Sequence, residues 1–282
     1  DDNPRLTRLG TQEWINVKRK IYKATEKLAS ELIDLYAFRK IQKGYSFEVD
    51  SSWQNSLESS FPFQETDDQI TTLNEVKADM ELPSPMDRLV CGDVGYGKTE
   101  VALRSAFKAA QSGKQVAILV PTTVLAQQHF ETFISRLQPF PVNINVLSRF
   151  KSKQSQREIV EEINNGSIDI VIGTHRLIQK DIKFKNLGLL IIDEEHKFGV
   201  SHKEFLARFY RNIDILSLSA TPIPRTLQMS LSGIRDMSTI ETAPNERIPI
   251  KTFVSDKTNS IISEAILREK DRGGQVFFLH NR

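Results

Sequence analysis

Residues 67–218 alternate short, almost continuous apolar runs with amphipathic segments of helical periodicity. Strands that are apolar throughout are typical of parallel sheets, which helices cover on both faces. The sequence therefore predicts an α/β fold built on a parallel sheet. Such sheets bind ligands at the carboxyl ends of their strands, so functional residues are expected there. The expected strands are residues 88–91, 116–120, 144–147, 168–172, 189–193 and 213–218.

A long amphipathic helix is expected before this sheet. In residues 11–43 apolar side chains recur every three or four positions, with Lys, Arg and Glu on the opposite face. Thr11 and Gly44 supply the start and stop signals of this helix. A short helix is expected near residues 52–60.

The α/β pattern restarts after residues 244–247, with an expected strand at 250–254, a helix at 259–270 and a strand at 275–279. Two strands and one helix are too few to bury a sheet on both faces, so we interpret this segment as the truncated start of a second domain. The expected division is a helical segment at 1–60, a first α/β domain at 61–246 and the start of a second at 247–282.

The composition excludes some classes of protein. No run of about 18 apolar residues occurs, so no membrane partner is expected. The only cysteine, Cys91, excludes a disulfide within the chain and fits a reducing cytoplasm; we interpret it as a small buried side chain. A net charge of +2 neither predicts nor excludes nucleic acid, because helix N-termini and a few arginines can grip phosphates locally.

Residues 92–99 match the phosphate-binding pattern G-x-x-x-x-G-K-[ST] in full. The pattern lies between an expected strand and an expected helix at 100–111, which is the context that a phosphate loop requires. Its glycines let backbone N–H groups surround phosphate oxygens. Lys98 is expected to reach the β- and γ-phosphates, and Thr99 to hold Mg²⁺. With ATP and Mg²⁺ as the expected cofactors, the candidate binding residues are Gly92, Asp93, Val94, Gly95, Tyr96, Gly97, Lys98, Thr99 and Glu100.

A second set of candidates comes at the end of an apolar strand, where Asp193 and Glu194 reach the edge of the sheet. Asp193 is expected to hold the Mg²⁺ shell, and Glu194 to orient and deprotonate the attacking water. His196 either contacts the γ-phosphate or the Ser219 segment, or is a partly exposed histidine at the strand end. Together with Lys98 these three residues are the catalytic candidates.

The order of motifs resembles that of superfamily-two helicases and translocases. In those proteins a phosphate loop is followed by Asp-Glu-x-His, here residues 193–196, and by Ser-Ala-Thr, here residues 219–221. Further segments resemble the adenine-reading and strand-gripping motifs of the same group; they are residues 63–69, 121–129 and 173–177. The resemblance implies a RecA-like domain, followed by the start of a second RecA-like domain.

Two families share most of these motifs, the RecG-type branched-DNA helicases and the bacterial transcription-repair coupling factors. Residues 86–102, 147–150 and 193–200 resemble the coupling factors most closely, whereas residues 218–227 fit both families. The helix at 11–43 also resembles the linker helix that precedes the motor of coupling factors. The resemblance covers essentially the whole chain and implies a fragment with the linker helix and the first motor domain.

By this resemblance Gln69 reads adenine through hydrogen bonds, and Phe61 or Phe63 packs against the base. A glutamine amide can pair with an edge of adenine, and an aromatic ring can stack on it. The alternative is that both phenylalanines are core residues on either side of Pro62.

The resemblance also implies contacts with a DNA backbone. Hydroxyls, backbone amides and arginines suit phosphate contacts, so sequence-independent and salt-sensitive binding is expected. Each such residue could instead be a helix cap or a loop residue. The candidate DNA-binding residues are Thr122, Thr123, Ser148, Arg149, Thr174, His175 and Arg176. Ser219 and Thr221 are expected to couple hydrolysis to domain movement, and Arg225 is either a DNA contact or an inter-domain ion pair.

The leading hypothesis is the ATP-binding motor domain of a double-stranded-DNA translocase of the coupling-factor type, in a bacterial cytoplasm. The whole protein would act on stalled RNA polymerase and recruit excision-repair proteins through domains outside this chain. One alternative is the motor domain of a RecG-type helicase, and another is a nucleotide-gated binding module without turnover. Because the family completes its ATP site with arginines from the second motor domain, the chain alone is expected to bind ATP and hydrolyse it weakly or not at all.

Overall fold

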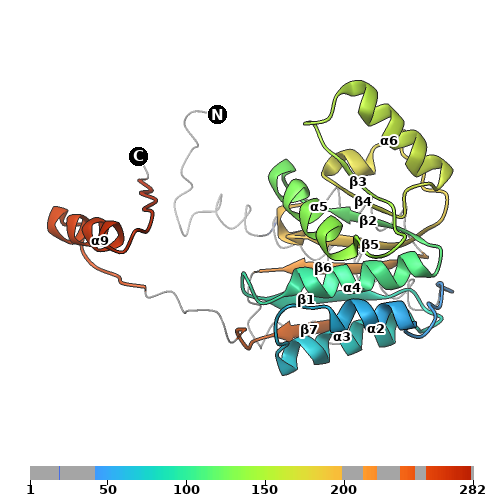
Figure 1. Ribbon diagram of the computed structural model, residues 1–282, viewed down its shortest axis with the longest axis horizontal. Helices are drawn as coiled ribbons and strands as arrows, with labels where there is room; N and C mark the ends of the chain where they lie inside the picture. Colours follow the sequence, from blue (N-terminus) through green and yellow to red (C-terminus); the bar gives the residue numbers. More distant parts are fainter. Residues whose placement is uncertain (1–18, 20–41, 199–211, 221–235, 245–251, 281–282) are drawn as a thin grey trace. The chain divides into compact units, whose positions relative to one another are not determined.

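Figure 1 shows the computed structural model of the chain. It describes residues 19, 42–198, 212–220, 236–244 and 252–280. The chain forms two compact units, Asp1–Asn245 and Glu246–Arg282. The helix expected at 11–43 lies almost wholly outside the described residues. Among the described helices, none is both long enough and apolar enough to span a membrane.

The first unit is built on a seven-stranded sheet with the order β3-β4-β2-β5-β6-β1-β7 (Figure 1). The strands are β1 Asp87–Gly92, β2 Gln115–Leu119, β3 Ile144–Leu147, β4 Ile170–Gly173, β5 Leu187–Asp193, β6 Asp214–Ser219 and β7 Asp236–Ile240. Each pair of neighbours is parallel. The predicted parallel sheet is therefore confirmed, and six strands lie within two residues of the positions that the apolar runs predict.

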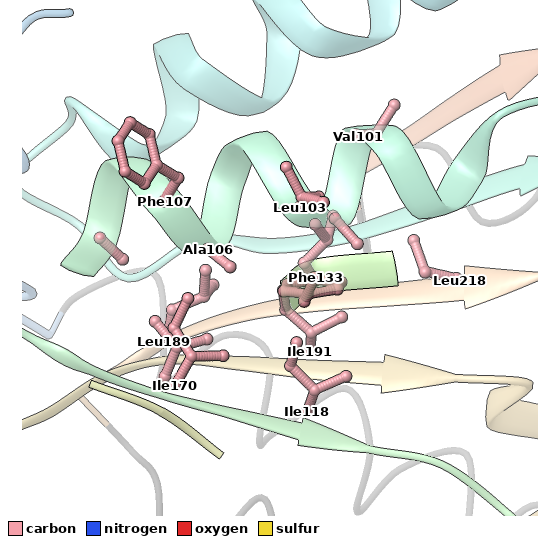
Figure 2. Packing of buried hydrophobic residues seen from close by; sticks show 14 of the residues in the cluster. Val101, Leu103, Ala106, Phe107, Ile118, Phe133, Ile170, Leu189, Ile191 and Leu218 are labelled. Carbon is pink, nitrogen blue, oxygen red and sulfur yellow. The ribbon is translucent and has the colours of Figure 1, made fainter. Parts of the chain in front are cut away.

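Helices cover both faces of this sheet (Figure 1). They are α2 Ser52–Ser59, α3 Asp67–Met80, α4 Lys98–Gln111, α5 Thr123–Leu137 and α6 Lys153–Asn165, with short 3-10 turns η1 His175–Ile178 and η2 Glu195–Lys197. Successive strand residues point to opposite faces. Ile118 thus belongs to one apolar cluster, which includes Phe107 of α4 and Phe133 of α5 (Figure 2). Leu119 belongs to a second cluster, which includes Ile163 of α6. The two apolar clusters confirm that the sheet is covered on both sides.

The apolar pattern does not predict the edge strand β7, because only two of its five residues are apolar. A buried polar contact holds this strand: Arg88 of β1 donates to Ser238 Oγ at 2.9 Å and to Asp79 of α3 at 2.6 Å. The strand runs beside β1, so that Ile240 lies opposite Gly92. The polypeptide therefore leaves the sheet next to the phosphate loop.

The second unit contains the helix α9, Asn259–Asp271, where a helix is predicted. The strands predicted at 250–254 and 275–279 are wrong for the residues described there, since 252–258 and 274–280 form no strand. A strand needs a hydrogen-bonding neighbour. Phe253 and Phe277 are correspondingly 77% and 95% exposed. The expected division of the chain at residues 60 and 246 stays a prediction.

Candidate functional site

The phosphate loop connects the end of β1 to the start of α4. Gly95 and Gly97 have φ angles of 82° and 84°, in the left-handed region that favours glycine. Lys98 is 9% exposed, and its Nζ donates to the carbonyl oxygens of Gly92 at 2.6 Å and Asp93 at 2.9 Å. The loop thus curls around the ammonium group of its own lysine.

Burial lowers the pKa of Lys98, and the nearby carboxylates of Asp193, Glu194 and Asp93 oppose this shift. The ammonium group is therefore desolvated and faces acidic groups at the end of β5. Such a cation is well placed to accept an anionic ligand, because most of its hydration is already removed.

The carboxylate of Asp193 is held at both oxygens. Oδ1 accepts the backbone N–H of Glu194 at 2.9 Å, and Oδ2 lies 2.8 Å from Nε2 of His129. Because an ionised carboxylate only accepts hydrogen bonds, the His129 Nε2 carries the hydrogen. Asp193 is 9% exposed, so its carboxylate has a fixed orientation at the edge of the sheet.

Glu194 has a φ angle of 52° and is the only non-glycine residue with a positive φ in the described part of the chain. A left-handed conformation costs a residue with a side chain about 1–2 kcal/mol. Strain of this kind gathers at functional sites, where the surrounding structure imposes it. Glu194, the expected general base, is therefore the residue whose backbone is strained.

The loop, β5 and one face of α5 line a pocket of about 450 Å³. Its lining residues are Val94, Gly95, Gly97, Lys98, Thr99, Leu125, Gln128, His129, Thr132, Asp193 and Glu194. Thr99 and Asp193 offer a hydroxyl and a carboxylate oxygen, which are ligand types that Mg²⁺ accepts beside nucleotide phosphates. The residues present therefore fit the expected nucleotide and metal.

Four residues of this pocket belong to α5 and are not among the nucleotide-site residues that the sequence predicts. Leu125, Gln128, His129 and Thr132 are spaced by three, four and seven residues, so they share one face of the helix. That spacing is visible in the sequence, but only the packing of α5 on the sheet brings these residues to the phosphate loop and the end of β5.

Gln69 holds the phosphate loop in place. Its Oε1 accepts the Thr66 N–H at 3.0 Å to complete a capping box on α3, and its Nε2 donates to the Tyr96 carbonyl at 3.0 Å. A Cβ atom at Gly97 would lie 2.4 Å from the Gln69 Nε2. Contact between Gln69 and adenine, which stays a prediction, would require this amide to exchange or share a hydrogen bond.

Phe61 and Phe63 form an edge-to-face pair with centroids 5.5 Å apart. The guanidinium groups of Arg104 and Arg136 lie 5.1 and 5.4 Å from the Phe61 ring centroid. Glu100 accepts from both arginines, at 2.9 and 2.8 Å, so it anchors them in this structure and does not line the 450 Å³ pocket. Phe63 is 53% exposed, so it offers the more accessible ring surface.

A second pocket, of about 300 Å³, lies at the carboxyl ends of β2, β3 and β4. It is lined by Pro121, Thr122, Thr123, Arg149, Gln156, Thr174, His175 and Arg176. Six of the seven candidate DNA-binding residues therefore meet here. The exception is Ser148, which is 3% exposed and accepts the N–H of Phe150.

Some side chains of this second pocket form hydrogen bonds within the protein. Thr122 caps α5 by accepting the Leu125 N–H at 3.2 Å. Arg176 forms a bidentate pair with Asp181, at 2.7 and 2.5 Å, which holds the pKa of that carboxyl below its usual range. Arg149 and His175 are exposed. The pocket therefore presents exposed cationic or ring nitrogen groups beside buried hydroxyls.

The remaining candidates lie at the edges of the described region. Ser219 ends β6 and is 6% exposed, opposite Cys91 of β1, which is buried as predicted. The backbone of His196 lies in η2, and its side chain is outside what the structure describes. Thr221 and Arg225 also lie outside the described residues.

Residues 66–230, more than half of the chain, match the model of the DEAD/DEAH box helicase family. The chain belongs to the DEAD/DEAH box helicase family. The family match begins at the cap of α3 and spans the phosphate loop, the acidic pair and the second pocket. A nucleotide-binding ATPase domain of a DNA helicase or translocase family is thereby confirmed, whereas the residues that hold ATP and Mg²⁺ stay a prediction.

Two curated relatives show which members of the helicase family this DEAD/DEAH box domain resembles. It is 55% identical to the transcription-repair-coupling factor of Bacillus subtilis (strain 168) over 99% of the chain, and 53% identical to that of Staphylococcus epidermidis over 100%. The chain spans 24% of the length of each relative. The expected resemblance to coupling factors is confirmed.

Solved helicase structures share the fold of this DEAD/DEAH box domain. RecG bound to a three-way DNA junction matches with a TM-score of 0.73 and 35% identity, over 90% of this chain and 35% of that chain. The helicase MrfA bound to DNA matches with a TM-score of 0.56 and 16% identity, over 81% of this chain and 36% of that one. The RecA-like helicase fold is confirmed.

Proposed function

We propose that this chain is the ATP-binding motor domain of a double-stranded-DNA translocase of the transcription-repair-coupling type. The observation that carries the proposal is the arrangement of two pockets on one sheet edge. Thr123, the first residue of α5, lines the second pocket, and His129 on the same helix lines the first. A nucleotide site and a nucleic-acid site that share a rigid helix suit a motor.

In the first pocket Lys98 would transfer its hydrogen bonds from loop carbonyls to the β- and γ-phosphates of ATP. Thr99 and Asp193 would hold Mg²⁺, which when bound neutralises charge on the phosphates. Glu194 would orient the attacking water and accept its proton. The chain alone would bind ATP and hydrolyse it weakly, because the family draws further arginines from a second motor domain.

In the second pocket the exposed Arg149 and His175, with hydroxyls of Thr122 and Thr174, would contact the phosphates of one DNA strand. Such contacts carry no base information, so the affinity would depend on salt and not on sequence. Contacts with RNA polymerase and excision-repair proteins, in a bacterial cytoplasm, would belong to the whole protein. The coupling factors of which this chain spans 24% support that assignment.

A RecG-type branched-DNA helicase is the second candidate, and the 35% identity to RecG favours it. The two candidates differ in what the intact protein does to DNA. A translocase of the coupling type would displace a third strand from a DNA triplex without opening forks, whereas a RecG-type enzyme would unwind forked DNA. Fork unwinding by the intact protein without triplex displacement would reject the first proposal.

Nucleotide binding can be tested on the chain itself with a fluorescent ATP analogue in the presence of Mg²⁺. Lys98→Ala should remove most of the binding. Lys114→Ala is the matched control, because this lysine bonds to Asn186 and lies over the Tyr45 ring, away from the pocket. Equal binding by the parent and Lys98→Ala would contradict the assignment of the site.

A further inference from the structure

His129 is the α5 side chain that reaches the acidic end of β5. It is 6% exposed, its ring packs edge-to-face on Phe133 at a centroid distance of 6.4 Å, and its Nε2 lies 2.8 Å from Oδ2 of Asp193. The two residues are 64 positions apart in the sequence. The contact therefore depends on the fold and not on local sequence.

With the hydrogen bond from His129, both oxygens of the Asp193 carboxylate have a partner. The Glu194 N–H fixes Oδ1 from the strand, and the imidazole fixes Oδ2 from the helix. A hydrogen bond to a buried, ionised acceptor is stronger than a neutral one. Without the imidazole the carboxylate could rotate about its χ2 torsion, which is broad for aspartate.

The imidazole is itself held firmly. Phe133, which supports the ring, is fully buried in the core between α5 and the sheet (Figure 2). The cap at Thr122 fixes the start of the helix, seven residues before His129 and thus about 10 Å away along the axis. His129 is therefore a donor presented by a rigid element, which is what precise orientation of a second group requires.

We infer that His129 is a positioning residue of the nucleotide site, which orients Asp193 to receive the Mg²⁺ that accompanies the nucleotide. The inference rests on the proposed function. Outer partners of metal-binding groups commonly act in this way, and their loss weakens metal binding without removing a ligand. In this assignment His129 acts on the metal through the carboxylate of Asp193.

Two amide variants test whether the side chain at position 129 must reach the Asp193 carboxylate. The side-chain amide of glutamine extends about as far as imidazole Nε2, whereas that of asparagine ends near the position of Nδ1. A fluorescent ATP analogue is titrated with Mg²⁺, and separately without it, on the whole chain. His129→Asn should raise the Mg²⁺ concentration for half-maximal binding by about 10-fold or more. Metal-free binding should change much less than Mg²⁺-supported binding, and His129→Gln should restore most of the parent's Mg²⁺ dependence.

A second comparison shows whether the effect passes through the carboxylate. In an Asp193→Asn background, His129→Asn should cause no further change in the Mg²⁺ dependence. Thermal melting of each variant shows that it is folded, and Gln127→Ala on the exposed side of α5 is the control.

Two results would overturn the inference alone while the parent still binds the Mg²⁺-nucleotide. One is a Mg²⁺ dependence of His129→Asn equal to that of the parent. The other is an equal loss of binding with and without Mg²⁺ that His129→Gln does not restore. If the parent itself showed no Mg²⁺-dependent binding, the proposed function would fail, and the inference with it.

Discussion

Asp68, in the first turn of α3, accepts the backbone N–H of Thr242 at 2.7 Å, although the two residues are 174 positions apart. The same Oδ2 atom accepts the N–H of Glu241 at 2.9 Å. The carboxylate thus holds the polypeptide where it leaves β7. Its neighbour Gln69 holds the phosphate loop, so one helical turn contacts both segments.

The Asp68 contact predicts a pH-dependent stability. Hydrogen bonds from Thr242 hold the pKa of Asp68 below its usual value of 3.8. A lowered pKa in the folded state means that the stabilisation is complete above 3.8 and is lost as the pH falls through the lower, folded value. Asp68→Asn should therefore melt below the parent at neutral pH, and the difference should shrink in acid. A difference that is constant down to the acid limit would contradict this.

Arg88 should stabilise the edge of the sheet. Arg88→Ala leaves Asp79 and Ser238 without their donor and should lower the free energy of unfolding by about 1.5–3 kcal/mol. We expect less than for a wholly buried ion pair, because the Glu75 side chain in the same cluster is 43% exposed. Urea unfolding measures the change, with Arg157→Ala on the exposed side of α6 as the control. Equal values for the two variants would contradict a role in holding β7.

Gly97 and Gly113 form a natural pair for testing the phosphate loop. Both are left-handed, with φ angles of 84° and 71°, so alanine should cost each about 1–2 kcal/mol of backbone strain. A Cβ at Gly97 would also meet Gln69 at 2.4 Å, whereas a Cβ at Gly113 meets nothing within 4 Å. Gly97→Ala should therefore reduce binding of an ATP analogue, and Gly113→Ala should only lower the melting temperature. Similar nucleotide binding by both variants would exclude this reading of the contact.

Arg149 should contribute to DNA binding without contributing to specificity. Arg149→Ala should weaken duplex binding to a similar extent for unrelated sequences and reduce the slope of log affinity against log salt by about 1. Fluorescence anisotropy across a salt series measures both effects, and Arg157→Ala serves again as the control. A loss confined to one DNA sequence would indicate base contacts instead.

The sequence predicts the parts of this structure that depend on local pattern. The apolar strands, the phosphate loop and the acidic residues at the end of β5 carry their own signals. The edge strand β7 is missed because Arg88 buries Ser238 there in place of an apolar contact. The strands predicted near Phe253 and Phe277 show the converse, since apolar residues do not form a strand without a neighbour.

The residues of the candidate site are likewise predicted only where their motifs are local in sequence. Lys98 and Asp193 can be recognised from sequence because their motifs are local. His129 cannot, because only the packing of α5 brings its ring to Asp193. Glu100 lies next to the phosphate loop in sequence, yet its carboxylate accepts hydrogen bonds from Arg104, one turn along α4, and from Arg136 of α5.

Gly92, the first residue of the phosphate loop, lies opposite Ile240, the last residue of β7. A Cβ at this position would lie 3.2 Å from both the Ile240 side chain and its carbonyl oxygen, so the neighbour would have to shift by a few tenths of an ångström. The lack of a side chain at position 92 therefore leaves room for the end of β7 beside the phosphate loop. A larger residue at position 92 would push against the last residue of β7 and so alter the path by which the polypeptide leaves the sheet.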